Sequence, residues 1–526
     1  MKMKFTFLSL LMFCMQIIHA QNSAYDKTFG TNAAVITEIF PDDHGKSLLT
    51  QPDDKILVAG SYELLNDIHF YVHRYLSNGK PDITFGTNGI VTISIADKFT
   101  IYPRNMILQP DGKILLLSNF HVIDNSNSEK SLIHRLDKNG NLDITFGNNG
   151  VIESSANNVN EHLNNCVLLP DGSIICIGTT TSDTSFKSGI LVKKYDKNGK
   201  IDNKFGKNGR FTYFSNESSI VLGVDIDVLK KDGSLIFFAE HYTGISSSFL
   251  IKTDSIGNLD NTFGKTGIVR INDAKNDNLP LKLKILPNDK ILIMNIKKSD
   301  DYKHTTFLKQ YTADGNVDKS FADNGVMTFK NPDYVYYMGD FRLTPNKKIL
   351  TTGSLRSIGK NTLSVLQQFD LNGNIDKTFG NKGSLILDYG NSNTWFFESA
   401  LKSDCKIICT ASAYIDDRFS NCIVQIDPTK FDTAPIATDL KNIQLFPNPV
   451  TNQVTLSIEL STSQSLDIQL FDINGRFISD FNTANKKFSA CKNEIVLELP
   501  SSLTSGTYFV NIRSQEGVSV VKMVKM

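Results

Sequence analysis

The amino-acid sequence predicts an all-β fold: a seven-bladed β-propeller of four-stranded blades, followed by a small antiparallel β-sandwich. A phrase such as NGNLDITFGNNG returns in similar form along most of the chain, and its phenylalanines lie 56 to 61 residues apart. A second phrase, such as QPDGKILLLS, keeps the same spacing. Repeats of this length are typical of solenoids and propellers. The phenylalanines of the seven copies are Phe29, Phe85, Phe146, Phe205, Phe263, Phe321 and Phe379.

Each repeat contains four short β-rich segments and no helical periodicity. One repeat contains the run from Gly89 to Ile95, then NMILQ, KILLLS and SLIHRL. The turn Pro110-Asp111-Gly112 follows NMILQ, and these residue types favour a tight turn because proline presets φ and glycine accepts a positive φ. Four-stranded units repeated around an axis form propeller blades, and seven blades lie within the known range.

The phrase NGNLDITFGNNG is predicted to join the last strand of one blade to the first strand of the next. Asn139-Gly140 would form a turn, Asp143 would accept local backbone hydrogen bonds, and Phe146 would fill the seam between two blades. A single blade cannot bury its own faces, so its stability must come from contacts with its neighbours. The phrase is therefore interpreted as a structural element and not as a binding site.

A calcium loop is the alternative interpretation of this phrase. The segment from Asp137 to Asp143 weakly resembles an EF-hand loop, which needs glycine at its sixth position and glutamate at its twelfth. Here glycine is fourth and the twelfth residue is Asn148. The hairpin-turn interpretation is favoured, calcium stays open as an alternative, and no cofactor is predicted.

The N-terminal residues 1–20 are predicted to be a signal peptide. Lys2 and Lys4 precede a short apolar run, and Ala20 supplies a small residue for cleavage. No later stretch approaches the roughly 20 apolar residues of a membrane-spanning helix. The formal net charge of zero lacks the electrostatic signature of a nucleic-acid-binding protein. We therefore expect an exported protein with no membrane span and no nucleic-acid partner.

Six cysteines remain beyond the signal peptide, too few for a disulfide scaffold in a chain of 526 residues. Cys166 with Cys176, or Cys409 with Cys422, could pair across neighbouring strands. A metal site of Cys405, Cys409 and Cys422 is the alternative. Cys409 occupies a repeat position that is hydrophobic in other copies, which favours a buried apolar role.

Three boundaries follow from the pattern. The repeats define a propeller over residues 21–431, and residues 432–442 lack a strand pattern and read as a linker. Residues 443–526 contain short alternating or apolar segments, which predict a small antiparallel sandwich.

The repeat motif LDxTFGxxG, followed by PDGKILVAG, resembles the delta-60 repeat of bacterial exported proteins. The resemblance covers roughly residues 25–431, with departures at Lys231, Ala322, Ser403 and Cys405. It implies a β-propeller and no established chemistry.

The tail is similar to the type A C-terminal sorting domain of the type IX secretion system of the Bacteroidota. Its motifs are FPNP at 446–449, FDINGR at 471–476, SGTYFVNI at 505–512 and two closing lysines. The resemblance implies a partner, the type IX machinery, and delivery through the periplasm to the cell surface or medium, usually with later removal of the tail. A permanent carbohydrate-binding sandwich is the alternative. The implied sorting residues are Pro447, Asn448, Pro449, Gly506, Tyr508, Lys522 and Lys525.

Ligand recognition is expected on the variable loops, which lie on the face opposite the PDG turns. The sixth and seventh repeats supply several aromatic residues there, which could stack on sugars or pack on a protein partner. Blade packing is the competing interpretation, because large or planar residues recur eight positions before the PD turns. The candidate ligand-binding residues are Tyr334, Tyr336, Tyr337, Tyr389, Trp395, Tyr414, Asp416, Asp417 and Arg418.

No catalytic motif is present: the chain has no HExxH, no GxSxG and no phosphate-binding glycine loop. The predicted function is a non-catalytic binding module for a glycan or a surface protein. One alternative is a polysaccharide hydrolase or lyase, which for hydrolysis needs carboxylates that converge in a pocket. The other is a purely structural surface protein.

Overall fold

The computed structural model describes most of the chain from Ala24 onward. For some residues next to the segments that are not described, it describes the backbone but not the side chain. The predicted signal peptide (1–20) and the predicted linker (432–442) lie outside the described part. The described residues are 24–30, 33–36, 44–64, 67–93, 99–122, 129–154, 161–181, 187–215, 219–271, 278–298, 304–330, 335–356, 362–387, 394–415, 418–428, 443–460, 464–472, 477–481, 483, 486–489, 491–514 and 518–526.

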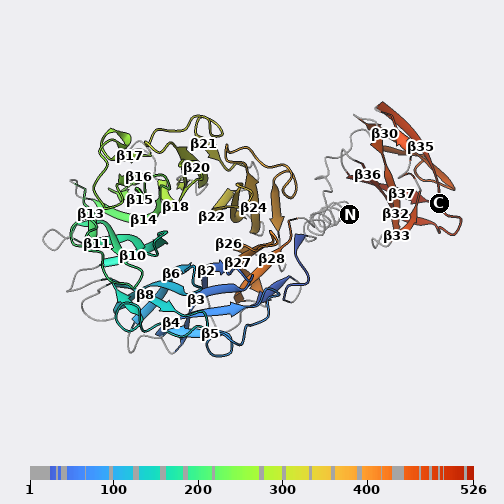
Figure 1. The fold of residues 1–526 in the computed structure, drawn as a ribbon. Helices are drawn as coiled ribbons and strands as arrows, with labels where there is room; N and C mark the ends of the chain where they lie inside the picture. Colours follow the sequence, from blue (N-terminus) through green and yellow to red (C-terminus); the bar gives the residue numbers. More distant parts are fainter. Residues whose placement is uncertain are drawn as a thin grey trace. The chain divides into compact units, whose positions relative to one another are not determined.

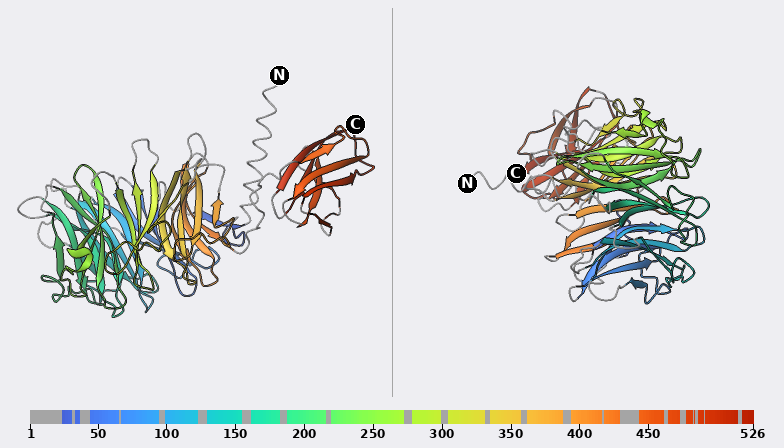
Figure 2. Two further views of the ribbon diagram at one scale, coloured as in Figure 1. Left: turned by 90° about the horizontal axis from the view of Figure 1, so that it is seen from above. Right: turned by 90° about the vertical axis from the view of Figure 1, so that its left-hand side faces the viewer.

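The chain divides into two compact units, one of residues 21–430 and one that holds residues 431–526. In the first unit, four-stranded antiparallel blades surround a common axis (Figure 1). Figure 2 shows the blades from the side, with their strands running across the thickness of the ring. A single parallel bridge between Ile68 and Thr100 links the first two blades into one eight-stranded sheet. The predicted seven-bladed propeller is confirmed.

The blades are numbered in chain order, and each begins with its innermost strand. Blade 1 contains β2 (His44–Thr50), β3 (Ile56–Leu64), β4 (Asp67–Tyr75) and β5 (Ile90–Ile93). Blade 2 contains β6 (Phe99–Leu108), β7 (Ile114–Val122), β8 (Glu129–Leu136) and β9 (Val151–Glu153). Blade 3 contains β10 (Glu161–Leu168), β11 (Ile174–Thr181), β12 (Ser188–Tyr195) and β13 (Arg210–Tyr213).

The remaining blades follow the same order. Blade 4 contains β14 (Ile220–Val228), β15 (Leu235–Tyr242), β16 (Ser246–Thr253), the 3-10 turn η2 (Phe263–Lys265) and β17 (Ile268–Arg270). Blade 5 contains β18 (Asn278–Ile285), β19 (Ile291–Lys297), β20 (Thr305–Tyr311) and β21 (Val326–Thr328). Blade 6 contains β22 (Val335–Leu343), β23 (Ile349–Arg356), β24 (Leu363–Phe369) and β25 (Ser384–Leu387). Blade 7 contains β26 (Thr394–Leu401), β27 (Ile407–Ile415), β28 (Arg418–Ile426) and β1 (Ala34–Ile36).

The connection assigned to the recurring phrase is corrected by this topology. The phrase around Phe146 joins β8 to β9, which are the third and fourth strands of the same blade. The crossing to the next blade follows the fourth strand instead. The repeat is therefore offset from the blade by one strand, and β1 at the start of the chain completes blade 7 by pairing with β28. This pairing closes the ring.

The seam position predicted for the phenylalanine is confirmed. Phe146 is 0% exposed and packs in a cluster with side chains of β7 and β8 in its own blade and of β10 and β11 in the next. The Arg135 guanidinium carbon lies 4.3 Å from the centre of its ring. The amide of Gly147 donates to the carbonyl of Asn198 in the phrase of the next blade. The seam between blades 2 and 3 thus joins them through both side chains and backbone.

The segment considered as a calcium loop closes on itself. The Asp137 carboxylate accepts hydrogen bonds from the backbone amides of Asn139 and Asn141 and from the Asn141 side chain. These contacts are those of a hairpin turn. Within the described residues, no group of three or more histidine, cysteine, aspartate or glutamate side chains is arranged to hold a metal ion.

One of the two cysteine pairings is present in the structure. Cys166 and Cys176 face each other on β10 and β11 and form a disulfide. Cys409 and Cys422 are buried free thiols in blade 7. Burial raises the pKa of Cys422 to about 12, so both act as apolar side chains.

The C-terminal unit is a two-sheet sandwich. Its buried side chains, among them Val454, Leu456, Ile468 and Val510, form one apolar core between the sheets. The first sheet has the order β29-β30-β35 and the second β33-β32-β36-β37. The strands are β29 (Gln444–Phe446), β30 (Gln453–Leu460), β31 (Gln464–Ser465), β32 (Asp467–Asp472), β33 (Phe477–Asp480), β34 (Lys487–Phe488), β35 (Cys491–Glu498), β36 (Gly506–Arg513) and β37 (Val518–Lys525). The described part of the chain contains no helix with the length and hydropathy that a bilayer crossing requires.

Candidate functional site

Two of the predicted ligand-binding residues, Tyr337 on β22 and Trp395 on β26, come together through a third residue. They belong to the innermost strands of blades 6 and 7, and the guanidinium of Arg356 lies against both rings. The Arg356 Cζ atom is 4.8 Å from the Tyr337 ring centre and 5.7 Å from that of Trp395. Both distances fall within the range of cation–π attraction. We call Tyr337, Arg356 and Trp395 the ring–arginine cluster.

The cluster lies at the end of the blades that carries the variable loops. Arg356 is the last residue of β23 and is exposed, while Tyr337 and Trp395 are half-buried. His304, just before β20 in blade 5, meets the Tyr337 ring edge-on at 6.0 Å between ring centres. Three successive blades thus contribute to one aromatic and cationic surface.

A β-bulge in the innermost strand sets the direction of these side chains. In β22 the register shifts between Met338 and Asp340, so Tyr337 and Asp340 pair with Ser354 and Thr352 on β23. Ser354 and Thr352 are two residues apart and share a face of the sheet. The bulge therefore places Asp340 on the same face as Tyr337, one step deeper in the ring. The corresponding bulge in β26 does the same for Glu398 beneath Trp395.

The deeper carboxylates connect neighbouring blades. Asp340 Oδ2 accepts a hydrogen bond of 3.3 Å from the Ser399 amide in blade 7. Glu398 Oε2 accepts one of 2.8 Å from the Leu48 amide in blade 1. Asp225 of blade 4 likewise accepts one of 2.7 Å from the Leu283 amide in blade 5. These carboxylates satisfy backbone donors on the innermost strands, which are the inner edges of the sheets.

The charges in this deeper layer alter two pKa values in opposite directions. Burial, together with the neighbouring Asp340 charge, raises the pKa of Glu398 to about 7. Burial acts on Asp340 too, but the charges of Lys282 and Arg342 outweigh it and hold the pKa of Asp340 below its usual range. The pair therefore holds one ionised carboxylate and one that titrates near neutral pH.

The other predicted ligand-binding residues have different positions. Tyr336 is 9% exposed and packs on Phe329 in the core of blades 5 and 6, so the expectation that it contacts a ligand is corrected. Strand alternation turns it away from the face that carries its neighbour. The backbones of Tyr414 and Arg418 lie at the ends of β27 and β28, and their side chains are outside the described part. The predicted residues outside the described part altogether are Tyr334, Tyr389, Asp416 and Asp417.

Sequence reasoning missed Arg356 and His304. The repeat does contain a signal for Arg356. The position seven residues after the first residue of each blade's second strand holds a different residue type in each blade, except that two blades share a tyrosine. These residues are Glu63, His121, Thr181, Tyr242, Lys298, Arg356 and Tyr414. A variable position at the end of a regular strand indicates a surface that differs from blade to blade.

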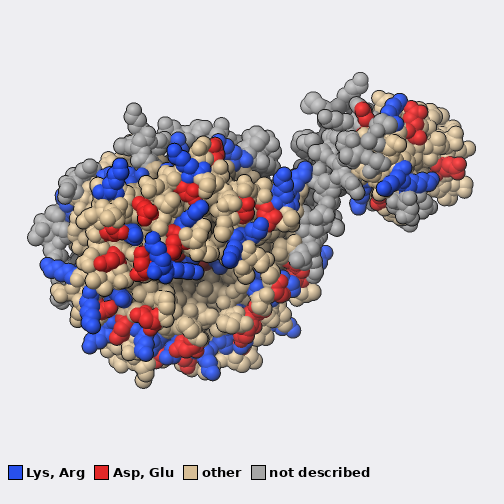
Figure 3. Space-filling model, turned by 45° about the horizontal axis from the view of Figure 1, so that its top comes forward, with Lys and Arg blue, Asp and Glu red and all other residues tan. Residues whose placement is uncertain are grey.

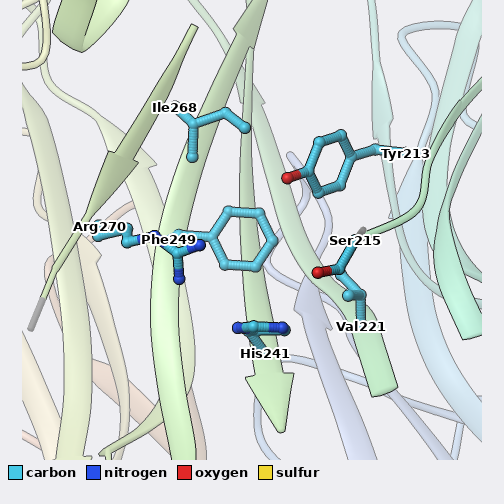
Figure 4. Close-up of a pocket in the computed structure, with 7 residues that line it drawn as sticks. All are labelled: Tyr213, Ser215, Val221, His241, Phe249, Ile268 and Arg270. Carbon is cyan, nitrogen blue, oxygen red and sulfur yellow. The ribbon is translucent and has the colours of Figure 1, made fainter. Parts of the chain in front are cut away.

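A small pocket lies elsewhere, between blades 3 and 4 (Figure 4). Its volume of about 10 Å³ has room for about one water molecule. His241 in its wall contacts the Ser219 hydroxyl at 2.8 Å. The pocket is too small for a sugar, and its lining residues are Tyr213, Ser215, Val221, His241, Phe249, Ile268 and Arg270.

The surface of the propeller carries both signs of charge in close mixture (Figure 3). A hollow opens at the centre of the ring in this view, and no large area of one sign surrounds it. This agrees with the formal net charge of zero. Recognition is therefore expected to depend on local groups and not on a field of one sign.

Several of the implied sorting residues are brought together in the C-terminal unit. The Asn448 side chain donates to the Lys522 carbonyl at 2.8 Å and accepts from the Val524 amide at 2.8 Å. Gly506 pairs with Lys525 across β36 and β37. The Tyr508 hydroxyl donates to the Thr504 carbonyl at 2.9 Å. Pro447 and Pro449 flank Asn448 on the surface.

Comparison with known proteins agrees with the two units. Residues 444–526 match the family of secretion system C-terminal sorting domains. Residues 51–85 and 109–146 match a family described as a domain of unknown function (DUF5122) beta-propeller. No curated protein matches the chain.

Solved structures similar to this chain have low identity to it. Polysaccharide lyase Uly1 is 10% identical with a TM-score of 0.42, over 79% of this chain and 95% of that one. The acylaminoacyl peptidase of Pyrococcus horikoshii is 11% identical with a TM-score of 0.39, over 80% and 58%. MPT-4, a mannose phosphorylase from Leishmania mexicana, is 10% identical with a TM-score of 0.30, over 63% and 85%. Likeness at these levels says nothing about ligand or chemistry.

The blades and the matched tail define a class: a β-propeller protein with a C-terminal sorting domain of the type IX secretion system. Such a domain indicates export, either to the outer cell surface or as a secreted protein. It also implies interaction with the type IX secretion machinery.

Proposed function

We propose that the propeller is a non-catalytic binding module whose ligand is a glycan or a surface protein, with a glycan favoured. The observation that supports this is the ring–arginine cluster, in which two blades place aromatic rings around one exposed guanidinium. Aromatic faces pack on the apolar faces of sugar rings, and the cation supplies hydrogen-bond donors beside them. Arg356 occupies a strand position whose residue differs between most of the blades.

Delivery of this module is the proposed role of the tail. The sorting domain would carry the propeller across the outer membrane through the type IX machinery and be removed afterwards. We further propose that the repeats are delta-60 repeats and that the protein comes from a member of the Bacteroidota. The motifs LDxTFGxxG and FPNP support these assignments.

A glycan array with the purified full chain tests the binding function. Trp395→Ala and Tyr337→Ala should each weaken binding by about tenfold or more, because truncation of a central aromatic anchor costs about 2 kcal/mol. Tyr242→Ala is the control, since Tyr242 is an exposed tyrosine of blade 4, at the strand position that Arg356 occupies in blade 6. Unchanged binding in both site variants would remove the cluster from the ligand site.

A hydrolase or lyase is the second candidate, and one observation favours it. Asp340 and Glu398 lie beneath the two rings with pKa values moved in opposite directions, as acid and base pairs require. Their hydrogen bonds to the next blade favour a structural role instead. Release of new reducing ends or unsaturated products from a polysaccharide, abolished in Glu398→Gln, would establish catalysis. A purely structural protein would bind nothing in either assay.

A further inference from the structure

We propose that the ring–arginine cluster selects acidic saccharides. A sugar ring would stack on Tyr337 or Trp395, and the Arg356 guanidinium would bind a carboxylate or sulfate on the same sugar or its neighbour. This inference rests on the proposed binding function and adds the chemical class of the ligand.

The first support is the way in which Arg356 is held. The two rings contact the guanidinium at 4.8 Å and 5.7 Å from its central carbon. These ring contacts supply no lone-pair acceptor for the N–H donors of the guanidinium. Arginine carries five such donors and no acceptor, and its planar fork matches a carboxylate or sulfate with two parallel hydrogen bonds.

The second support is the contrast with arginines that serve the fold. Arg74 and Arg135 also lie over aromatic rings, at 4.4 Å and 4.3 Å. Their donors are taken: Arg135 bonds the Asp143 carboxylate at 2.9 Å, the Lys197 carbonyl at 2.7 Å and the Thr145 hydroxyl at 3.3 Å. Both side chains are 5% exposed. They are structural cations with filled donor sets.

Arg356 differs in each of these respects. It is exposed, and among the described residues its guanidinium has neither a carboxylate partner nor a hydrogen-bond acceptor. The carboxylates deeper on the strands that carry the two rings, Asp340 and Glu398, already have partners in Lys282, Arg342 and the backbone of the next blade. Within the described part of the chain, the positive charge held against the two rings therefore has no anionic partner.

The third support is the combination of chemistries. Aromatic rings alone suit neutral sugars, and an arginine alone suits any anion. In this cluster the guanidinium carbon lies 4.8 Å and 5.7 Å from the two ring centres. An aromatic ring and a guanidinium this close together select a ligand that has both an apolar ring face and an acidic group. Uronic acids and sulfated sugars share this chemistry.

Isothermal titration with matched pairs of oligosaccharides tests the proposal. The carboxylate pair is an oligogalacturonate and its full methyl ester, and the sulfate pair is a sulfated galactan oligosaccharide and its desulfated form. The wild-type full chain should bind at least one acidic member about tenfold or more tightly than its neutral partner, because charge-assisted hydrogen bonds are about twice as strong as neutral ones. The preference should weaken as salt rises.

Three variants assign the effect to residues. Arg356→Gln should reduce the acidic preference to within about twofold while neutral binding persists, because the charged guanidinium fork is lost and both aromatic rings remain. Trp395→Ala should weaken acidic and neutral members alike. Arg270→Gln, which removes an exposed arginine from β17 of blade 4, is the control and should change neither.

Each outcome decides the proposal. Equal affinity for acidic and neutral partners, or binding of neutral glycans alone, would overturn the acidic preference and leave the binding function standing. A preference that survives Arg356→Gln would overturn the assignment to this cluster. Failure of every probe, and of the whole glycan array, would overturn both the acidic preference and the glycan-binding function.

Discussion

At the scale of the residue, the aspartate of the recurring phrase is held by several polar partners at once. Asp143 Oδ1 accepts hydrogen bonds from the amide and hydroxyl of Thr145, and Oδ2 contacts Arg135 at 2.9 Å and Lys113 at 3.2 Å. Burial alone would raise its pKa, but these partners outweigh burial and hold the pKa well below its usual range. Its counterparts keep a lysine within 3.5 Å in the other blades: Asp26, Asp82, Asp202, Asp260, Asp318 and Asp376.

This network predicts a pH-dependent cost for Asp143→Asn. At pH 7 the variant should lose about 3 kcal/mol, because removal of one partner leaves the cations of a largely buried network uncompensated. Since the folded pKa lies below the ordinary value of 3.8, the stabilisation is present above pH 4 and is lost as the pH falls through the folded pKa.

Urea unfolding at pH 7 and near pH 3 checks this prediction. The difference between wild type and variant should shrink at the lower pH. Asp111→Asn is the control, because Asp111 contacts the same Lys113 with 57% of its side chain exposed and should matter little. A constant difference at both pH values would contradict the ionic explanation.

At the scale of the element, stability resides in the seams between blades. Each blade presents apolar faces that only a neighbour can cover, and the phenylalanine of the phrase enters that seam. Sequence periodicity predicted four strands in each repeat but assigned the phrase to the wrong connection. The alternation of apolar residues shows where strands lie and does not show which edge the short fourth strand joins.

The seam predicts a large cost for Phe146→Ala. The ring is 0% exposed, so its loss should destabilise the propeller by about 3–5 kcal/mol through a cavity and the lost contact with Arg135. Ile144→Ala, two residues away, is the matched control because Ile144 is 70% exposed. Urea denaturation midpoints compare the two. Similar midpoints for both variants would show that the seam is not tightly packed.

At the scale of the whole molecule, the propeller closes through residues far apart in the chain. The β1 strand pairs with β28, and the Gly30 amide donates to the Asn78 carbonyl of blade 1 at 2.9 Å. Glu398 and Leu48 join blades 7 and 1 across 350 residues. The C-terminal unit has its own apolar core and makes its own hydrogen bonds. The chain thus combines a closed ring with a separately built sorting domain.

Deletion of residues 443–526 tests the role of the tail. The propeller core does not include these residues, so the truncated chain should fold and accumulate in the periplasm instead of reaching the surface or medium. Cell fractionation with an antibody to the propeller measures the distribution. Full-length Tyr337→Ala should be exported normally and serves as the control. Normal export of the truncated chain would refute the sorting role.

The candidate site shows how far single-sequence reasoning reached. Tyr337 and Trp395 were predicted because aromatic residues gather in two neighbouring repeats, and the structure does bring them to one cluster. Tyr336 was predicted for the same reason but lies in the core, because neighbouring residues on a strand face opposite sides. Arg356 was missed, since its relation to both rings depends on contacts between two blades.

Sequence periodicity and composition were enough to predict the number of blades, the turn residues, the buried phenylalanines and the separate tail. All of these are local or periodic properties, so the residue types and their spacing are enough to show them. The closure of the ring by β1, the hydrogen bonds of inner carboxylates to the backbone of the next blade, and the position of Arg356 against two aromatic rings became visible in the three-dimensional structure. These features join residues from different blades, and a linear pattern does not record which distant surfaces meet.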